Sequence, residues 1–145
     1  MRTGKLTKSE EDYLEAIAFL KEKGDVVRVK DISDALGVRK PSVVGALRGL
    51  KSKDLIVQEA YGSVDLTKSG AVLANGIKKR HDLLLTFLTR VLAVDRKTAE
   101  ADACRLEHVV SKKTIAQLTK FVAFMNACPE SKRTKCIESF QGYGK

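Results

Sequence analysis

The sequence has no tryptophan, two prolines, two histidines, five phenylalanines and three tyrosines. So few aromatic side chains argue against an aromatic cage or a platform on which bases stack. No apolar run approaches the roughly 20 residues that a membrane-spanning helix needs. The N-terminus runs directly into charged residues and lacks the apolar stretch of a signal peptide. We therefore expect a cytoplasmic protein without a membrane partner.

Cysteine is scarce as well, and its number is odd. Cys104, Cys128 and Cys136 cannot all pair within one chain. In a cytoplasmic protein such residues are more often free thiols or metal ligands than parts of a disulfide framework. Cys128 and Cys136 are open to three interpretations: an extra metal site, a redox switch, or a buried thiol and a tail residue.

Positive charge is abundant, with a formal net charge of +9. Such a charge fits a polyanionic partner. Residues 39–53 hold Arg39, Lys40, Arg48, Lys51 and Lys53 and no acidic residue. A run of charges is also typical of a solvated surface. The charge alone therefore does not distinguish a polyanion-binding surface from an ordinary solvated one, and a sequence motif is needed to do so.

The first half of the sequence has the pattern of a winged helix-turn-helix. Apolar spacing predicts a helix over about 7–23, a short helix over 30–36 closed by Gly37, and a helix that starts at Pro41 and ends near residue 53. We place Val44, Leu47 and Leu50 on the inner face of that last helix. Residues 55–59 and 64–66 alternate as two strands of a hairpin, where a winged module carries its wing.

The second half reads as helices over about 67–91, 98–110, 111–125 and 130–140. The predicted fold is mainly α, with an N-terminal winged helix-turn-helix followed by an all-helical domain. We place the DNA-binding domain at residues 1–70 and the helical domain at 71–145.

The outer face of helix 41–53 is lined by small residues, among them Gly45 and Gly49. A glycine inside a helix costs about 1 kcal/mol relative to alanine. Close approach to a DNA major groove would explain that cost, although neutral variation on a solvated helix would also allow it. We expect modest direct base readout and strong reliance on backbone contacts and DNA shape. The expected DNA-binding residues are Arg39, Lys40, Pro41, Ser42, Val43, Gly45, Ala46 and Arg48, with Tyr61 and Ser63 in the wing.

One predicted helix carries three metal-binding residue types on one face. Cys104, Glu107 and His108 stand at i, i+3 and i+4, so a thiolate, a carboxylate and an imidazole point the same way. Chance clusters of this size are common. Asp12 and Glu15 also stand at i and i+3 and could be metal ligands. They could equally be acidic residues that stabilise a helix start through the helix dipole. His81 could be a metal ligand or a surface histidine.

Several segments, in order and spacing, are similar to the diphtheria-toxin-repressor and manganese-transport-regulator family. The resemblance reaches to about residue 126 and rests on residues 9–17, 29–38, 41–44, 66–70, 80–84 and 107–108, with Ser111 after them. It implies a dimeric repressor that binds operator DNA when loaded with Fe(II) or Mn(II), and it implies that the all-helical part is the metal-binding and dimerisation domain. The 145 residues include no SH3-like domain of the iron branch, so the short architecture of the manganese branch is expected.

The resemblance also implies the ligands. The primary site would comprise Asp12, Cys104, Glu107 and His108, and a second site Glu15 and His81, with Glu107 as a bridge. Asp12 matches the manganese branch, whereas Cys104 matches the iron branch. Two positions depart from the iron branch's second site, since Leu85 stands in place of a carboxylate and Glu100 in place of a histidine ligand.

The thiolate of Cys104 favours softer ions, and Mn(II) is the weakest binder in the Irving–Williams series. We therefore expect Fe(II) first and Mn(II) next, with Zn(II), Co(II) or Ni(II) binding in vitro. Repression of metal-uptake genes is the expected outcome. Two alternatives stay open: a winged-helix regulator gated by thiol oxidation or a small organic ligand, and an enzyme that uses Cys104 and His108. The Cys104–His108 pair lacks an orienting third group, which argues against the enzyme.

Overall fold

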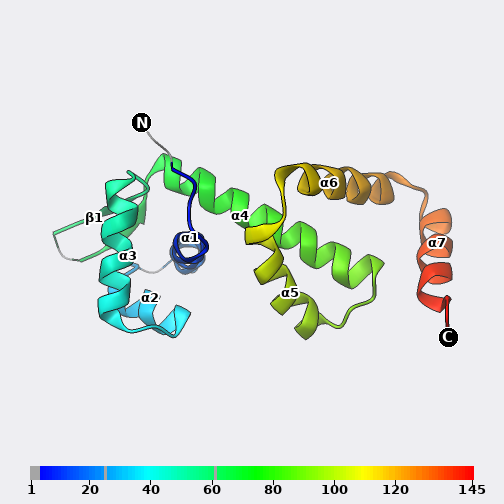
Figure 1. The fold of residues 1–145 in the computed structure, drawn as a ribbon, viewed down its shortest axis with the longest axis horizontal. Helices are drawn as coiled ribbons and strands as arrows, with labels where there is room; N and C mark the ends of the chain where they lie inside the picture. The colour runs from blue at the N-terminus through cyan, green and yellow to red at the C-terminus, as the bar shows by residue number, and fades with distance from the viewer. Residues whose placement is uncertain (1–3, 25, 61) are drawn as a thin grey trace. The chain divides into compact units, whose positions relative to one another are not determined.

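The computed structural model describes residues 4–24, 26–60 and 62–145 (Figure 1). The chain forms two compact units, the first ending at Lys78 and the second spanning Lys79–Lys145. The boundary falls inside helix α4, and the functional division at residues 70 and 71 stays a prediction.

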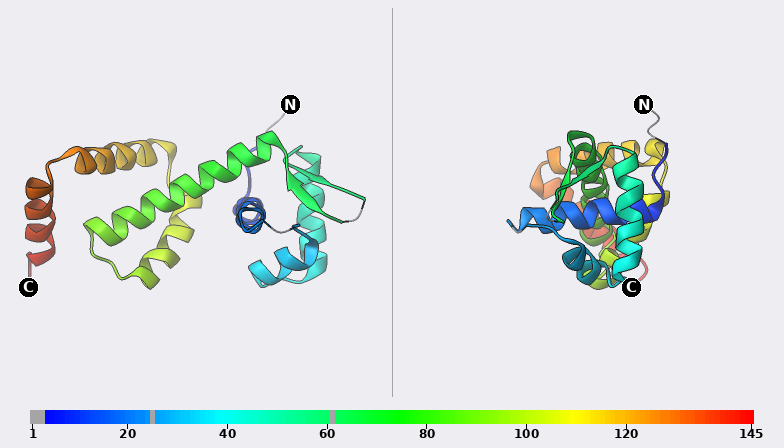
Figure 2. Two further views of the ribbon diagram at one scale, coloured as in Figure 1. Left: turned by 180° about the vertical axis from the view of Figure 1, so that it is seen from behind. Right: turned by 90° about the vertical axis from the view of Figure 1, so that its left-hand side faces the viewer.

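The first unit contains three helices and a hairpin. Its elements are α1 (Lys8–Glu22), α2 (Val29–Leu36), α3 (Lys40–Ser52), β1 (Ile56–Gln58), β2 (Val64–Leu66) and the start of α4 (Lys68–Thr86). The observed bounds lie within about two residues of the predicted ones. Helices α2 and α3 form the helix-turn-helix, and α1 runs across α3 (Figures 1 and 2).

One apolar core joins these elements. Leu14 and Ile17 of α1, Ile32 of α2 and Leu50 of α3 are fully buried within it. Burial of each such side chain contributes roughly 1.5–3 kcal/mol. This core fixes the three helices relative to one another, so it also fixes which face of α3 points outward.

The ends of the helices are set by local residues. Thr7 and Glu10 form a capping box at the start of α1. Helix α2 ends at Gly37, whose φ of 64° lies in the left-handed region that favours glycine. Gly70 meets a different requirement: a Cβ there would overlap the carbonyl group of Leu55.

The hairpin forms the wing. Strands β1 and β2 are antiparallel, and Val57 stands opposite Asp65. Arg28 forms an isolated bridge with Ser63, and the Val64 N–H donates to the Val27 carbonyl at 2.8 Å. The chain before α2 therefore ties the wing to the helix-turn-helix.

The second unit is helical throughout its regular elements. After α4 come the π-helical segment η1 (Phe87–Val91), α5 (Arg96–Val109), α6 (Lys112–Ala127) and α7 (Glu130–Gly142). The prediction of one helix over 67–91 is wrong in its last turn, where the hydrogen bonds change to π-helical spacing. The rings of Phe87 in η1 and Phe121 in α6 pack edge to face, with centroids 6.0 Å apart.

The predicted fold class is confirmed: a winged helix-turn-helix precedes an all-helical part. Within residues 4–24, 26–60 and 62–145, no helix has the length and apolarity needed to cross a membrane.

Candidate DNA-binding surface and metal centre

The buried stripe of α3 shows which face remains for DNA. Val43, Leu47 and Leu50 are buried, whereas Val44 is 45% exposed. The prediction that Val44 belongs to the inner face is therefore wrong. Positions 43, 47 and 50 follow the 3.6-residue period, and position 44 lies 100° further round the helix. The prediction of Val43 as a DNA-binding residue is corrected for the same reason, since its side chain lies in the core.

Most of the other predicted contacts lie on the open side of α3. Gly45 is 200° from Val43 on the helix, at the middle of the outward face. Ala46 is only half-buried and packs partly against the core. The remaining predicted residues of this segment are exposed: Arg39, Lys40, Pro41, Ser42 and Arg48.

The packing of the chain gives no reason for a glycine at position 45. Among the described residues, no atom other than those of the neighbouring residues and the local backbone of α3 lies within 4 Å of a Cβ built there. By contrast, Gly37 and Gly70 are explained by a positive φ and by a close carbonyl group. A residue that costs stability without an internal benefit is typical of a surface shaped for a ligand.

The wing contributes one described candidate. Ser63 is half-buried, and its hydroxyl lies 3.3 Å from a carboxylate oxygen of Glu59. Tyr61, the other predicted wing contact, lies outside the described residues. The acidic Glu59 beside Ser63 makes the wing less basic than the start of α3.

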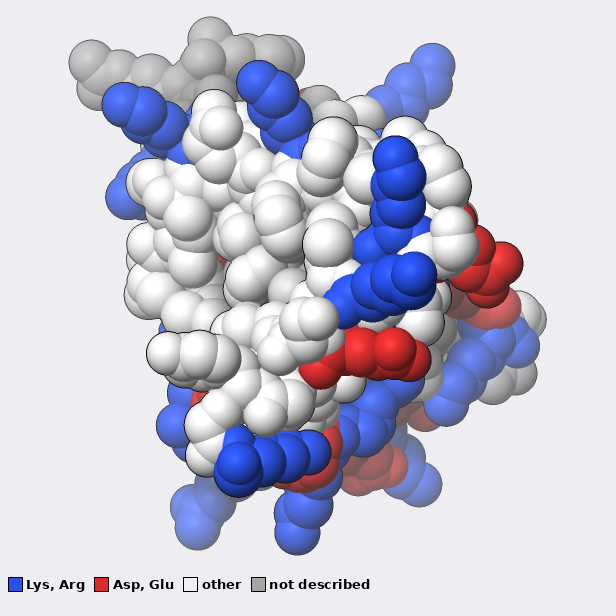
Figure 3. Space-filling model, turned by 90° about the vertical axis from the view of Figure 1, so that its right-hand side faces the viewer, with Lys and Arg blue, Asp and Glu red and all other residues white. Residues whose placement is uncertain are grey.

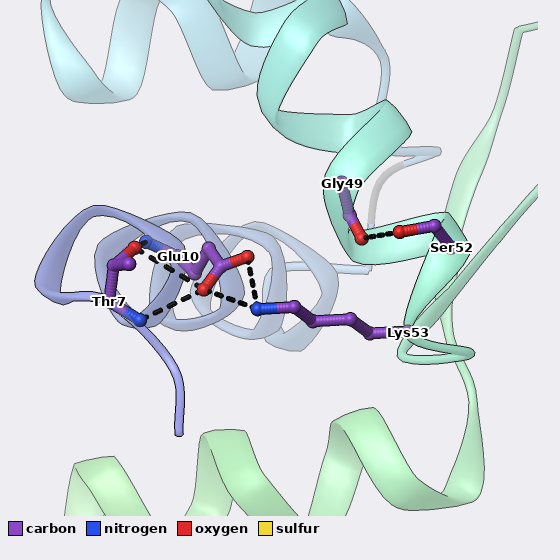
Figure 4. A network of polar contacts seen from close by, with 5 residues as sticks. All are labelled: Thr7, Glu10, Gly49, Ser52 and Lys53. Atoms are coloured by element: carbon purple, nitrogen blue, oxygen red, sulfur yellow. Dashed lines mark hydrogen bonds and ion pairs between the residues drawn. The ribbon is translucent and has the colours of Figure 1, made fainter. Parts of the chain in front are cut away.

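One cation of the basic run is held inside the unit. The Lys53 ammonium group contacts both carboxylate oxygens of Glu10, at 2.7 and 2.8 Å (Figure 4). Burial raises the pKa of Glu10, but hydrogen bonds from Lys53 and Thr7 outweigh it and hold that pKa below its ordinary value. Sequence reasoning missed this pair, because 43 residues separate its members and only the fold brings them together.

In the second unit, three of the predicted metal ligands converge. The Glu107 side chain on α5 is fully buried, and its Oε2 lies 2.8 Å from Nδ1 of His81 on α4. Its Oε1 lies 3.3 Å from Nε2 of His108. Both imidazoles are largely buried. A buried carboxylate between two imidazoles is a donor set that suits a divalent transition-metal ion.

The other predicted ligands are distributed differently. Cys104 is exposed on α5, one turn before Glu107 and His108. Glu100 accepts a hydrogen bond from Nε of Arg96 at 2.7 Å, so an ion pair with its own helix engages this carboxylate. Asp12 and Glu15 lie half-buried on α1 of the first unit. Their participation in a site with the second unit stays a prediction.

These features define a class: a DNA-binding protein with a winged helix-turn-helix and a helical domain that carries a divalent-metal donor set. The comparisons with known proteins agree with it. Residues 5–64 match the model of the iron dependent repressor, N-terminal DNA binding domain. Residues 67–134 match that of the iron dependent repressor, metal binding and dimerisation domain.

Individual relatives cover most of the chain. The HTH-type transcriptional regulator MntR of Bacillus subtilis is 32% identical over 135 residues, which are 93% of this chain and 93% of that protein. The structure of the manganese regulator SloR is 31% identical with a TM-score of 0.72; it covers 86% of this chain, which spans 58% of the SloR chain. A manganese-dependent transcriptional repressor in complex with manganese is 31% identical with a TM-score of 0.73, covering 79% of this chain and 53% of that one.

The chain therefore belongs to the iron-dependent repressor family that includes these manganese regulators, as its sequence predicted. It is a metal-dependent transcriptional regulator and not an enzyme.

Proposed function

We propose that this protein is a homodimeric repressor of metal-uptake genes in the cytoplasm, and that Fe(II) or Mn(II) activates its binding to operator DNA. The observation that carries the metal part of the proposal is the buried carboxylate of Glu107 between His81 and His108. A buried charge is costly unless it is paired or bound to a metal. A divalent ion would supply two positive charges and a fixed coordination geometry at this point.

The proposed primary ligands are Asp12, Cys104, Glu107 and His108, and the proposed second site uses Glu15 and His81, with Glu107 shared. The spacing of Cys104, Glu107 and His108 on α5 allows all three to serve one ion. Asp12 would bring α1 to the same ion. Glu100 is a weaker candidate, because Arg96 already engages its carboxylate.

The ligand chemistry favours Fe(II), with Mn(II) next. A thiolate contributes little to Mn(II) binding and more to Fe(II), Co(II) and Zn(II). Solved relatives support a site open to several ions, since one structure contains manganese and another, that of ScaR, has bound zinc. Zn(II), Co(II) and Ni(II) are therefore expected to bind in vitro.

Coupling to DNA would follow from the position of the ligands on two units. Asp12 belongs to α1, which packs on α3 in the first unit, whereas Glu107 and His108 belong to the second unit. If one ion is bound by both sets, it fixes the recognition helices of a dimer at one separation. That separation must match half-sites about one DNA turn apart, or a multiple of it. The ion acts by binding the DNA-competent arrangement more tightly than the others.

A dimer is supported by the apolar surface of the second unit. Val109, Phe121, Phe124 and Phe140 are exposed. Figure 3 shows an area without charged residues, bordered by Lys and Arg and by some Asp and Glu side chains. Exposed apolar side chains that gather into one patch are typical of protein interfaces. Helices α4 and α6 are the proposed dimer contacts.

The test uses a DNA duplex that the metal-loaded protein selects from a randomised pool. Its affinity is measured by fluorescence anisotropy under anaerobic, reducing conditions, with Fe(II), with Mn(II) and with a chelator. We expect tight binding with either ion and binding weaker by at least about tenfold with the chelator, which corresponds to about 1.4 kcal/mol of coupling. Affinity that the chelator does not change would rule out metal activation.

One alternative has an observation in its favour. The Cys104 thiol is exposed, as a redox-sensing cysteine must be. A regulator gated by thiol oxidation would lose or gain DNA affinity with peroxide and would respond equally with and without the chelator. The same anisotropy assay with peroxide distinguishes it from the metal sensor.

A further inference from the structure

One ion pair joins two helices of the first unit that have different proposed roles. Glu10 lies in the first turn of α1, which carries the proposed ligand Asp12, and Lys53 caps the end of the recognition helix α3. Lys53 Nζ lies 2.7 Å from Oε1 and 2.8 Å from Oε2 of Glu10. The two side chains are only 29% and 17% exposed, so solvent screens them less than an ordinary surface pair.

The Glu10 carboxylate is also fixed to its own helix. It accepts hydrogen bonds from the Thr7 backbone N–H at 2.9 Å and from the Thr7 hydroxyl at 3.3 Å. The Thr7 hydroxyl oxygen in turn accepts from the Glu10 N–H at 3.2 Å. Figure 4 shows this carboxylate between the first turn of α1 and the Lys53 side chain. A displacement of that turn would therefore move the end of α3 with it.

The N-terminal end of α1, where Glu10 lies in the first turn and Asp12 just after it, thus has two different sides. Glu10 and Asp12 are two residues apart, which places them about 200° apart around the helix axis. Glu10 faces the end of α3, and Asp12 points to nearly the opposite side of α1. Helix α3 has 13 residues and is about 20 Å long. Within the limits that the shared core sets, a rotation of a few degrees at Lys53 therefore moves Arg39 and Lys40, which precede and begin the helix, by roughly 1–2 Å.

We propose that the Glu10–Lys53 ion pair is a positioning contact that couples the first turn of α1 to the orientation of α3. An ion bound by Asp12 then orders this turn, and the pair carries the effect to the DNA-binding surface. The transmission of the metal effect from Asp12 to the DNA-binding surface rests on the proposed function. The positioning of α3 by the ion pair does not, because it requires only the contact between Glu10 and Lys53.

The variants are chosen to leave the capping box and the packing intact. Glu10→Gln keeps an acceptor that serves a capping box and removes the charge. Lys53→Met removes the ammonium group and keeps the aliphatic chain. Lys53→Arg is the conservative variant. Lys21→Met is the matched control, because it breaks the Lys21–Asp65 ion pair between α1 and the wing of the same unit.

Each variant is titrated with the selected duplex in the presence of Mn(II) and of a chelator. Thermal melting by circular dichroism and Mn(II) affinity by calorimetry are measured on the same samples. We expect Glu10→Gln and Lys53→Met each to lower duplex affinity about fivefold with Mn(II), while Mn(II) affinity and melting stay close to wild type. The double variant is expected to be no weaker than either single one. Lys53→Arg should restore binding, and Lys21→Met should bind like wild type.

The proposal is overturned if both single variants bind the duplex as tightly as wild type in both conditions, or if Lys21→Met weakens binding as much as they do. A wild-type protein that ignores Mn(II) contradicts the proposed function instead. In that case the positioning contact still predicts fivefold weaker binding by the single variants, now equally with Mn(II) and with chelator.

Discussion

Replacement of Gly45 by alanine should make the protein more stable and a poorer DNA binder. The added methyl group meets no described atom within 4 Å, so the folded chain accommodates it without strain. Alanine removes the entropic cost of a glycine inside a helix, which is about 1 kcal/mol, or about 4 °C in melting temperature for a small domain. At the same time, the methyl group stands at the middle of the outward face of α3, where the proposed close approach to the major groove would leave no room for it.

The expected loss in DNA affinity follows from the cost of overpacking. One extra methyl group in a well-packed contact costs about 1–3 kcal/mol. Duplex affinity should therefore fall about tenfold or more for Gly45→Ala and further for Gly45→Leu. Melting is followed by circular dichroism and affinity by fluorescence anisotropy with metal present.

Gly76→Ala is the matched control, because Gly76 also lies inside a helix and its added Cβ also meets no described atom within 4 Å. It should gain the same stability. Because α4 is a proposed dimer contact, its DNA affinity is compared with that of wild type only after sedimentation has shown the wild-type oligomeric state, and it should then be unchanged. If Gly45→Ala binds the duplex as tightly as wild type, the outward face of α3 does not approach DNA closely, and the explanation for this glycine fails.

Three further outcomes are expected. Gly70→Ala should destabilise the protein by at least about 2 kcal/mol in urea unfolding, because its Cβ overlaps the Leu55 carbonyl; an unchanged midpoint would contradict that contact. The hydrogen bond from Lys21 holds the pKa of Asp65 below its ordinary value. The ionised carboxylate therefore stabilises the fold fully at a pH above the ordinary pKa, and this stabilisation is lost as the pH falls through the lowered pKa. Asp65→Asn should therefore lower the melting temperature slightly at pH 7 and match wild type once the pH is below the lowered pKa of Asp65; a difference that does not change with pH would refute the ion pair. Cys104→Ser should weaken Co(II) and Zn(II) binding more than Mn(II) binding in competition titrations, and equal losses for all three ions would exclude a thiolate ligand.

The helices and the hairpin could be predicted closely because each has local signals. Thr7 and Glu10 mark a helix start and Gly37 a helix end. The apolar spacing on helix 41–53 predicted a buried stripe with Leu47 and Leu50, but it assigned Val44 to that stripe in place of Val43. Val44 was wrongly assigned to the buried face because a shift of one residue along the sequence changes the direction of a side chain around the helix by 100°. Local spacing alone does not distinguish the two assignments; packing against α1 and α2 does.

Interactions between distant segments could not be predicted from the residues alone. The spacing on α5 placed Glu107 and His108 on one face, but only the fold of the second unit brings His81 to the Glu107 carboxylate. The ion pair between Glu10 and Lys53 likewise joins residues that are far apart in the sequence and that only the fold brings together. The π-helical segment Phe87–Val91 also had no sequence signal, since its side chains suit an α-helix and its edge-to-face contact with Phe121 is a tertiary feature.

The metal response of the Glu107→Ala/His108→Ala variant most directly tests whether this donor set turns metal binding into DNA binding. Anisotropy with the selected duplex is measured across a Mn(II) titration, after circular dichroism has shown that the variant is folded. We predict that the variant binds the duplex as weakly at saturating Mn(II) as wild type does with chelator. A variant that still responds fully to Mn(II) would show that Glu107 and His108 do not hold the sensed ion.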